Sequence, residues 1–187
     1  MKAGVEPLVN DGFDGEANKR TLNYIQSQRE KGKNIVGIYC GYAPLELIRA
    51  ANAAPAVLCA FANKTIEAAE TVLPANLCPL IKSSYGFIKT DTCSFFALSE
   101  AVIAETTCDG KKKMFELISH IKPMHVMDLP QLPDQKEALN NWTVMIKRLK
   151  EFLETTFDRK INDWDVEQEI KETNIKNKLM NKIFDFA

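Results

Sequence analysis

The fold class of this 187-residue chain follows from residues 35–44, which read IVGIYCGYAP. Residues 35–39 form a short apolar run, and the glycine and proline beyond it predict that a buried strand ends there. Pro44 is typical of the first turn of a helix, so a helix is expected from Pro44 to Ala53. A strand followed at once by a helix is the unit from which parallel sheets with both faces covered are built.

The same alternation of strand and helix patterns continues as far as Pro133. Further strands are expected at 56–58, 101–104 and 124–127. Helices are expected at about 16–31 and 65–72, from Pro79 onward, and at 109–121. Four short apolar strands separated by helices predict an α/β fold: a parallel sheet flanked by helices, in a three-layer arrangement of the flavodoxin or Rossmann kind.

The composition changes at Pro133. All eight glycines and all eight prolines lie at or before that residue, whereas 21 of the last 54 residues are charged. Loss of every turn former together with a rise in charge predicts long helices that face solvent. One helix is expected from about Asp134 to Phe157, and a second from Asn162 or Asp163 that is still amphipathic at Ala187. We therefore expect an α/β domain at 1–133 and a helical segment at 134–187 that leads into a second domain.

Composition also argues against several classes of protein. The chain has 24 basic and 25 acidic residues, a formal net charge of −1, which lacks the electrostatic signature of a nucleic-acid binder. No apolar run approaches the roughly 20 residues that cross a bilayer. The first residues, MKAGVEP, lack the apolar core of a signal peptide. A cytoplasmic protein without a membrane or nucleic-acid partner is expected.

The five cysteines stand at positions 40, 59, 78, 93 and 108, with no CxxC pair. An odd number in a reducing compartment disfavours a disulfide framework, so any metal site must be assembled from distant segments. In an open parallel sheet, ligands bind beyond the carboxyl ends of the strands. Four of the five cysteines could face that edge, since Cys40 and Cys59 directly follow strands, Cys108 closely follows one, and Cys78 precedes a helix. Cys93, in a loop, is less well placed.

Two interpretations of these cysteines remain open from spacing alone. Free cysteine is often a buried apolar filler, and this interpretation is favoured for Cys40 and Cys59. Cys78 precedes Pro79, and Cys108 precedes Asp109, the expected N-cap of the next helix. A helix N-terminus favours thiolate, the form that binds metal. For Cys78 and Cys108, the interpretation as a buried filler and the interpretation as a metal ligand are equally favoured.

Three segments carry a resemblance to a known family. Residues 76–86, NLCPLIKSSYG, and 105–114, ETTCDGKKKM, resemble two signatures of the 2-hydroxyacyl-CoA dehydratase D-component family. Residues 42–51, YAPLELIRAA, look like its N-terminal signature, and 125–130, HVMDLP, fit in register. The likeness runs from about residue 20 to the end and covers the N-terminal half of such proteins. Within this family, the sequence of these segments is most similar to the branch called double-cubane cluster proteins.

The resemblance implies an oxygen-sensitive iron–sulfur protein. Cys78 and Cys108 match the first two cysteine ligands of a 4Fe–4S or double-cubane cluster, and the third ligand is expected outside this chain. Three thiolates leave one iron open, unlike the four that close an electron-transfer cluster. The implied partners are a homodimer mate or a related second subunit, an ATP-dependent activator, and an acyl-CoA substrate.

Some neighbouring residues are weaker candidates. Lys111, Lys112 and Lys113 could offset cluster charge or meet an acyl-CoA phosphate, although a lysine run is more often a solvated face. The run 83–85 (Ser-Ser-Tyr) could donate hydrogen bonds to cluster sulfurs. His120 and His125 are expected to be structural, because nothing pairs them at metal-ligand spacing.

Three hypotheses follow for the function. The first is the N-terminal part of an iron–sulfur enzyme that dehydrates a 2-hydroxyacyl-CoA, inactive as this chain alone. The second is a double-cubane protein that reduces small molecules at low potential without dehydratase activity. The third is a cluster-free α/β interaction domain or an inactive fragment, whose C-terminal apolar stripe would drive self-association.

Overall fold

A four-stranded parallel sheet forms the centre of the protein. The computed structural model describes residues 13–185. The strands pair in the order β2-β1-β3-β4, all parallel, with bounds β1 Asn34–Ile38, β2 Ala53–Val57, β3 Ala101–Glu105 and β4 Met124–Met127. This confirms the predicted parallel α/β sheet. Because the chain leaves β1 first toward β2 and later returns to β3 on the other side, the strand order reverses between β1 and β3.

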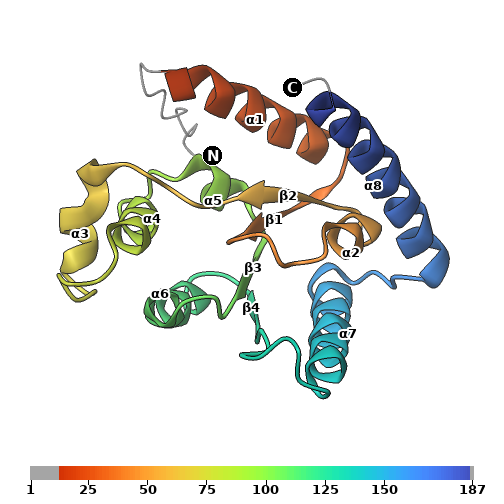
Figure 1. The fold of residues 1–187 in the computed structure, drawn as a ribbon. Coiled ribbons are helices and arrows are strands. Elements are labelled where there is room, and N and C mark those ends of the chain that lie inside the picture. The colour runs from red at the N-terminus through yellow and green to blue at the C-terminus, as the bar shows by residue number, and fades with distance from the viewer. Residues whose placement is uncertain (1–12, 186–187) are drawn as a thin grey trace.

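Helices cover both faces of the sheet, as the three-layer prediction requires. They are α1 Phe13–Glu30, α2 Leu45–Ala50, α3 Ile66–Glu70, α4 Pro79–Lys89, α5 Ser94–Leu98, α6 Asp109–Ser119, α7 Ala138–Phe157 and α8 Asp163–Phe184, with a short 3₁₀ turn, η1, at Asn63–Thr65. Figure 1 shows α4 and α6 on one side of the sheet and α2 and α7 on the other. Each strand contributes side chains to both sides of the sheet, because successive strand residues point to opposite faces.

The core is divided by this alternation into two main clusters. Ile38 and Ile103 pack with α2 and with Leu149 and Leu153 of α7, both of which are fully buried. Val102 faces the other side, in a cluster built with residues of α3, α4, α5 and α6. The start of α7 at Ala138 is later than the expected Asp134, but its apolar stripe packs against the sheet.

The last helix, α8, begins where the sequence indicated. Asn162 is its N-cap, and the Asn162 Oδ1 accepts a hydrogen bond from the Asp165 backbone N–H at 2.8 Å. Arg49 of α2 donates to Glu169 Oε2 at 2.8 Å and to Thr173 Oγ1 at 2.5 Å, which holds α8 beside α2. Among the described residues of α8, none is buried. Across residues 13–185, no helix is long and apolar enough to cross a membrane.

The second strand and the helix before it differ from the prediction. The expected helix 44–53 ends at Ala50, and the expected strand 56–58 occupies Ala53–Val57 instead. Asn52 adopts a left-handed backbone with φ 56°, which stops the helix, and asparagine tolerates this conformation better than most residues. The strand accepts Pro55 because β2 lies at the edge of the sheet that residues 13–185 form, where it pairs with β1 on one side.

Candidate functional site

The carboxyl edge of the sheet between β1 and β3 is the natural place for a site. Ligands of open α/β folds bind where the strand order reverses, beyond the carboxyl ends of the strands. Cys40 lies just beyond β1, while Thr107 and Cys108 lie just beyond β3. The sheet therefore brings to one edge residues that are 67 positions apart in the chain, with Cys40 Sγ 3.5 Å from Thr107 Oγ1.

The two cysteines of the predicted cluster site stand at helix starts. Cys78 is the N-cap of α4, with Pro79 at the first helical position, and Cys108 is the N-cap of α6. The expectation that Asp109 caps α6 is wrong: Asp109 is the first helical residue and pairs with Lys112 at 2.9 Å. Both cysteines are exposed, and neither side chain caps its own helix. Each thiol is thus accessible at a helix N-terminus, the positive end of the helix dipole.

A glycine lets the two helix starts come together. A Cβ placed on Gly110 would lie 2.8 Å from Leu77 Cδ1 and 2.9 Å from Ile81 Cδ1. Gly110 follows Cys108 by two positions, and the two side chains that it meets flank Cys78 in the sequence. The N-terminal turns of α6 and α4 are therefore in contact beside the two cysteines. Among the described residues, 13–185, no three His, Cys, Asp or Glu side chains form a group that could hold a metal ion.

A second constellation at the same edge joins Cys40 to the lysine run. Lys111 Nζ donates to Cys40 Sγ and also to Thr107 Oγ1 at 3.1 Å. Partial burial acts to lower the pKa of Lys111, but the hydrogen bond and charge of Cys40, with smaller effects of Cys59 and Glu105, raise it overall. The Lys111 side chain is half-buried against the Cys40 thiol, whereas Lys112 and Lys113 are exposed, as expected for a solvated face.

Glu105 is the residue of this edge that the sequence prediction missed. It ends β3 with 0 % exposure, and its Oε1 accepts the Tyr42 backbone N–H at 2.8 Å. Its Oε2 is buried and has no hydrogen-bond partner among residues 13–185. Burial raises the pKa of Glu105, against the lowering effects of the Tyr42 hydrogen bond and the Lys111 charge. The available signal was a carboxylate that ends the apolar strand pattern of residues 101–104.

The remaining cysteines have different environments. Cys59 is exposed, so its interpretation as a buried filler is wrong, and Cys40 is only half-buried. Cys93 is the N-cap of the short helix α5, where its Sγ accepts the Phe96 backbone N–H at 3.4 Å. Burial raises the pKa of the Cys93 thiol. Cys93 therefore has a structural role in the described part of the chain.

The serines that follow Cys78 bind backbone groups of the segment that follows β2. Ser83 and Ser84 are both buried within α4. Ser83 Oγ donates to the Ala62 carbonyl at 2.7 Å, and Ser84 Oγ accepts the Ala60 backbone N–H at 3.1 Å. These hydrogen bonds hold the segment after β2 against α4. Tyr85 is also buried, in the core between α4 and the sheet.

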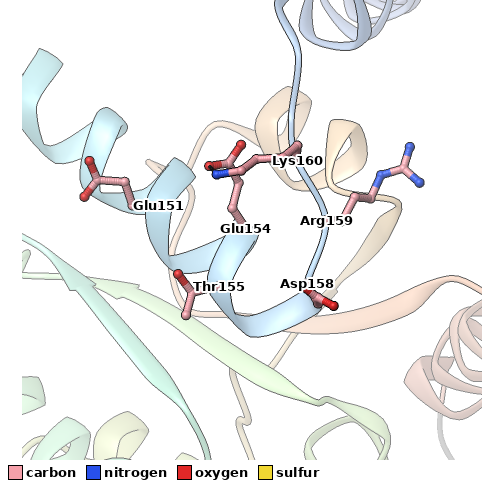
Figure 2. A pocket seen from close by; sticks show the side chains of 6 residues that line it. All are labelled: Glu151, Glu154, Thr155, Asp158, Arg159 and Lys160. Carbon is pink, nitrogen blue, oxygen red and sulfur yellow. Dashed lines mark hydrogen bonds and ion pairs between the residues drawn. The ribbon is translucent and has the colours of Figure 1, made fainter.

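A polar hollow of about 320 Å³ lies at the end of α7, on the other side of the sheet from α4 and α6. Figure 2 shows Glu154 and Lys160 side by side there, while Glu151 and Arg159 point away from them. Glu154 accepts the Ile161 backbone N–H at 2.8 Å and pairs with Lys160 at 3.3 Å. These groups close the turn between α7 and α8.

His125 stacks on Phe152 with ring centroids 5.3 Å apart, in keeping with its expected structural role.

Comparison with known proteins identifies the family. Residues 40–187 match the family described as 2-hydroxyglutaryl-CoA dehydratase, D-component, a family linked to iron–sulfur clusters. A similar relative from Escherichia coli (strain K12), named "Putative dehydratase subunit YjiM", is 43 % identical over 157 residues. The aligned region is 84 % of this chain but 41 % of that relative, so the chain spans about two fifths of the relative's length. The chain therefore belongs to the 2-hydroxyglutaryl-CoA dehydratase D-component family.

Proposed function

We propose that this chain is the cluster-binding N-terminal part of an iron–sulfur enzyme that acts on 2-hydroxyacyl-CoA, with Cys78 and Cys108 as two of the cluster's cysteine ligands. The observation that carries the proposal is the contact at Gly110, which sets the starts of α4 and α6 together at the carboxyl edge of the sheet. Two accessible thiols, each at the start of a helix, are suitable donors for iron.

The third ligand would come from outside this chain. The relative from Escherichia coli is more than twice as long as the region it shares with this chain, which leaves room for a second domain that carries one more cysteine. In this proposal residues 1–133 hold the cluster and residues 134–187 lead toward that second domain. A cluster held by three thiolates would supply low-potential electrons and one open iron for a substrate oxygen.

The protein's own groups would prepare this edge for an anionic cofactor and substrate. The N-termini of α4 and α6 present partial positive charge to the space beside Cys78 and Cys108. Lys112 and Lys113 are exposed on the first turns of α6, where they can attract the phosphates of an acyl-CoA. Within this proposal, a second subunit or a homodimer mate completes the enzyme, and an ATP-dependent activator delivers the electron.

Iron binding tests the proposal directly. The chain is reconstituted anaerobically with iron and sulfide, and bound iron, bound sulfide and the visible absorption are measured. Cys78→Ser and Cys108→Ser are each expected to lose most of the iron that the unmodified chain retains, because each removes one thiolate. Cys59→Ser is the matched control, since Cys59 is also exposed but is the N-cap of none of the described helices, and it should retain iron. Iron retention that is unaffected by both ligand substitutions would overturn the assignment.

The exposed face of α8 favours a second candidate, a cluster-free interaction domain. Large apolar side chains are exposed along this helix: Ile170, Ile175, Leu179, Met180, Ile183 and Phe184. An exposed apolar surface of this kind is typical of a protein–protein contact. Sedimentation distinguishes the candidates: self-association that Leu179→Asp abolishes, in a chain that retains no iron, supports the interaction domain over the enzyme.

A further inference from the structure

We propose that Cys40 and Lys111 form an oxidative cross-linking site, in which dioxygen joins Cys40 Sγ to Lys111 Nζ through a single oxygen atom. The site goes beyond the proposed cluster function and uses neither Cys78 nor Cys108. It rests on the direct contact between thiol and amine at the edge of β1 and β3.

The two reacting atoms are held together by a third group. Lys111 Nζ contacts Cys40 Sγ, and the Thr107 hydroxyl lies 3.1 Å from the nitrogen and 3.5 Å from the sulfur. All three side chains come from the ends of neighbouring elements, β1, β3 and α6. A single oxygen atom inserted between nitrogen and sulfur therefore needs only a small separation of two side chains that are already in contact.

The backbone at Cys40 has an uncommon conformation. Cys40 has φ 61°, a left-handed conformation that is uncommon for a residue with a side chain. The carboxylate of Glu105 holds the adjoining loop through the Tyr42 N–H at 2.8 Å. Glu105 is fully buried with its second oxygen unpartnered, and its charge acts on Lys111. A strained cysteine supported by a buried carboxylate is typical of positions that serve a function other than folding.

The reaction balances with dioxygen as the only oxidant. The thiol loses its proton, and the lysine, after release of its ammonium proton to solvent, loses one N–H hydrogen. One oxygen atom forms the new S–O and O–N bonds, and the other leaves as water with the two removed hydrogens. Sulfur and nitrogen each lose two electrons, and dioxygen gains four. Thr107 is exposed and Cys40 is half-buried, so dioxygen has access to the pair.

The cross-link would join segments 71 positions apart in the sequence. It would tie the end of β1 to the first turn of α6, across the point where the strand order reverses. Oxidised sulfur of this kind is open to reduction by thiols, which would restore the free cysteine and the free amine. The cross-link would therefore be a reversible covalent modification that forms on exposure to oxygen, beside the proposed cluster ligands.

Peptide mapping provides the test, on the full chain stripped of iron by a chelator so that the outcome does not depend on any cluster. One sample is kept anaerobic and one is exposed to air, and both are alkylated and digested with trypsin without reductant. The air-exposed sample should contain residues 34–49 linked to residues 90–112, with cleavage after Lys111 blocked. Its mass should exceed the sum of the two peptides by one oxygen less two hydrogens, and fragmentation should place the link at Lys111. A thiol reductant should abolish the linked product.

Matched variants separate this bond from other oxidation products. Lys111→Arg keeps the positive charge but should lose the linked product, whereas Lys112→Arg, one position along, should keep it. Cys40→Ser should lose it and Cys59→Ser should keep it, with circular dichroism used to verify that each variant is folded. A disulfide between Cys40 and Cys108, a sulfinic acid on Cys40, or an unaltered Cys40 thiol after air exposure would each overturn the proposal.

Discussion

Gly86 offers the sharpest test of how α4 is positioned. This glycine lies in the middle of α4, and a Cβ placed on it would lie 2.1 Å from the Thr65 carbonyl oxygen and 2.7 Å from the Thr65 carbonyl carbon. The obstacle is backbone, which cannot rotate away as the end of a side chain can. The substitution Gly86→Ala must therefore push α4 away from η1 by about 1 Å to reach ordinary van der Waals separation.

The magnitude follows from two opposing effects. Overpacking against backbone costs about 3 kcal/mol, at the upper end of the usual range for added methyl groups. The separation also stretches the hydrogen bond from Thr65 Oγ1 to the Ser83 carbonyl, which is 3.1 Å long. Alanine offsets about 1 kcal/mol of this through its better helix propensity. We expect Gly86→Ala to lower the free energy of unfolding by about 2 kcal/mol.

Urea denaturation followed by circular dichroism measures this difference. Gly41→Ala is the matched control, because a Cβ at Gly41 would meet nothing within 4 Å. Its free energy of unfolding should stay within about 0.5 kcal/mol of that of the unmodified protein or rise slightly. Gly110→Ala should be intermediate, since its Cβ would meet only the ends of the Leu77 and Ile81 side chains. A urea midpoint for Gly86→Ala at or above that of the unmodified protein would refute the reasoning.

Two further predictions concern the α7 side of the sheet. Leu149 is fully buried against β1 and β3, so Leu149→Ala should lower the free energy of unfolding by about 2–5 kcal/mol in the same urea assay. Leu139→Ala, at a position on α7 that is 76 % exposed, should change it by less than about 0.5 kcal/mol; equal losses would contradict the packing of α7. Burial, and then the Arg148 charge, lower the pKa of His125, so the folded state favours the neutral ring and stability should fall as the pH drops below about 6.5. His125→Phe keeps the stacking on Phe152 and should reduce the drop in urea midpoint between pH 7.5 and pH 5.5, whereas an unchanged drop would show that another group is responsible.

The expected effects at the two proposed sites separate them from one another. Loss of iron from Cys78→Ser or Cys108→Ser bears only on the cluster assignment, because the cross-linking test uses iron-free protein. Loss of the linked peptide from Lys111→Arg bears only on the Cys40 site. A chain that fails one test can therefore still pass the other.

Local sequence determined the elements that depend on local chemistry. The strand predicted at 101–104, which the structure extends to Glu105, and the start of α4 at Pro79 were both evident, because an apolar run and a proline in the first helical position act over a few residues. The bounds of β2 were not evident, since the alanine-rich run at 50–56 is compatible with helix or strand. Pairing with β1 decided in favour of the strand at Ala53.

The sequence by itself thus determined the parallel α/β class, the placement of Cys78 and Cys108 at helix starts, and the family. Only the tertiary structure decided which residues meet at the carboxyl edge: Cys40 with Lys111, Glu105 with Tyr42, and Gly110 with Leu77. These contacts join segments 71 and 63 positions apart in the first two cases, so no local pattern could encode them. The physical reason is the sheet, because pairing β1 directly with β3 brings together the segments of chain that follow those two strands.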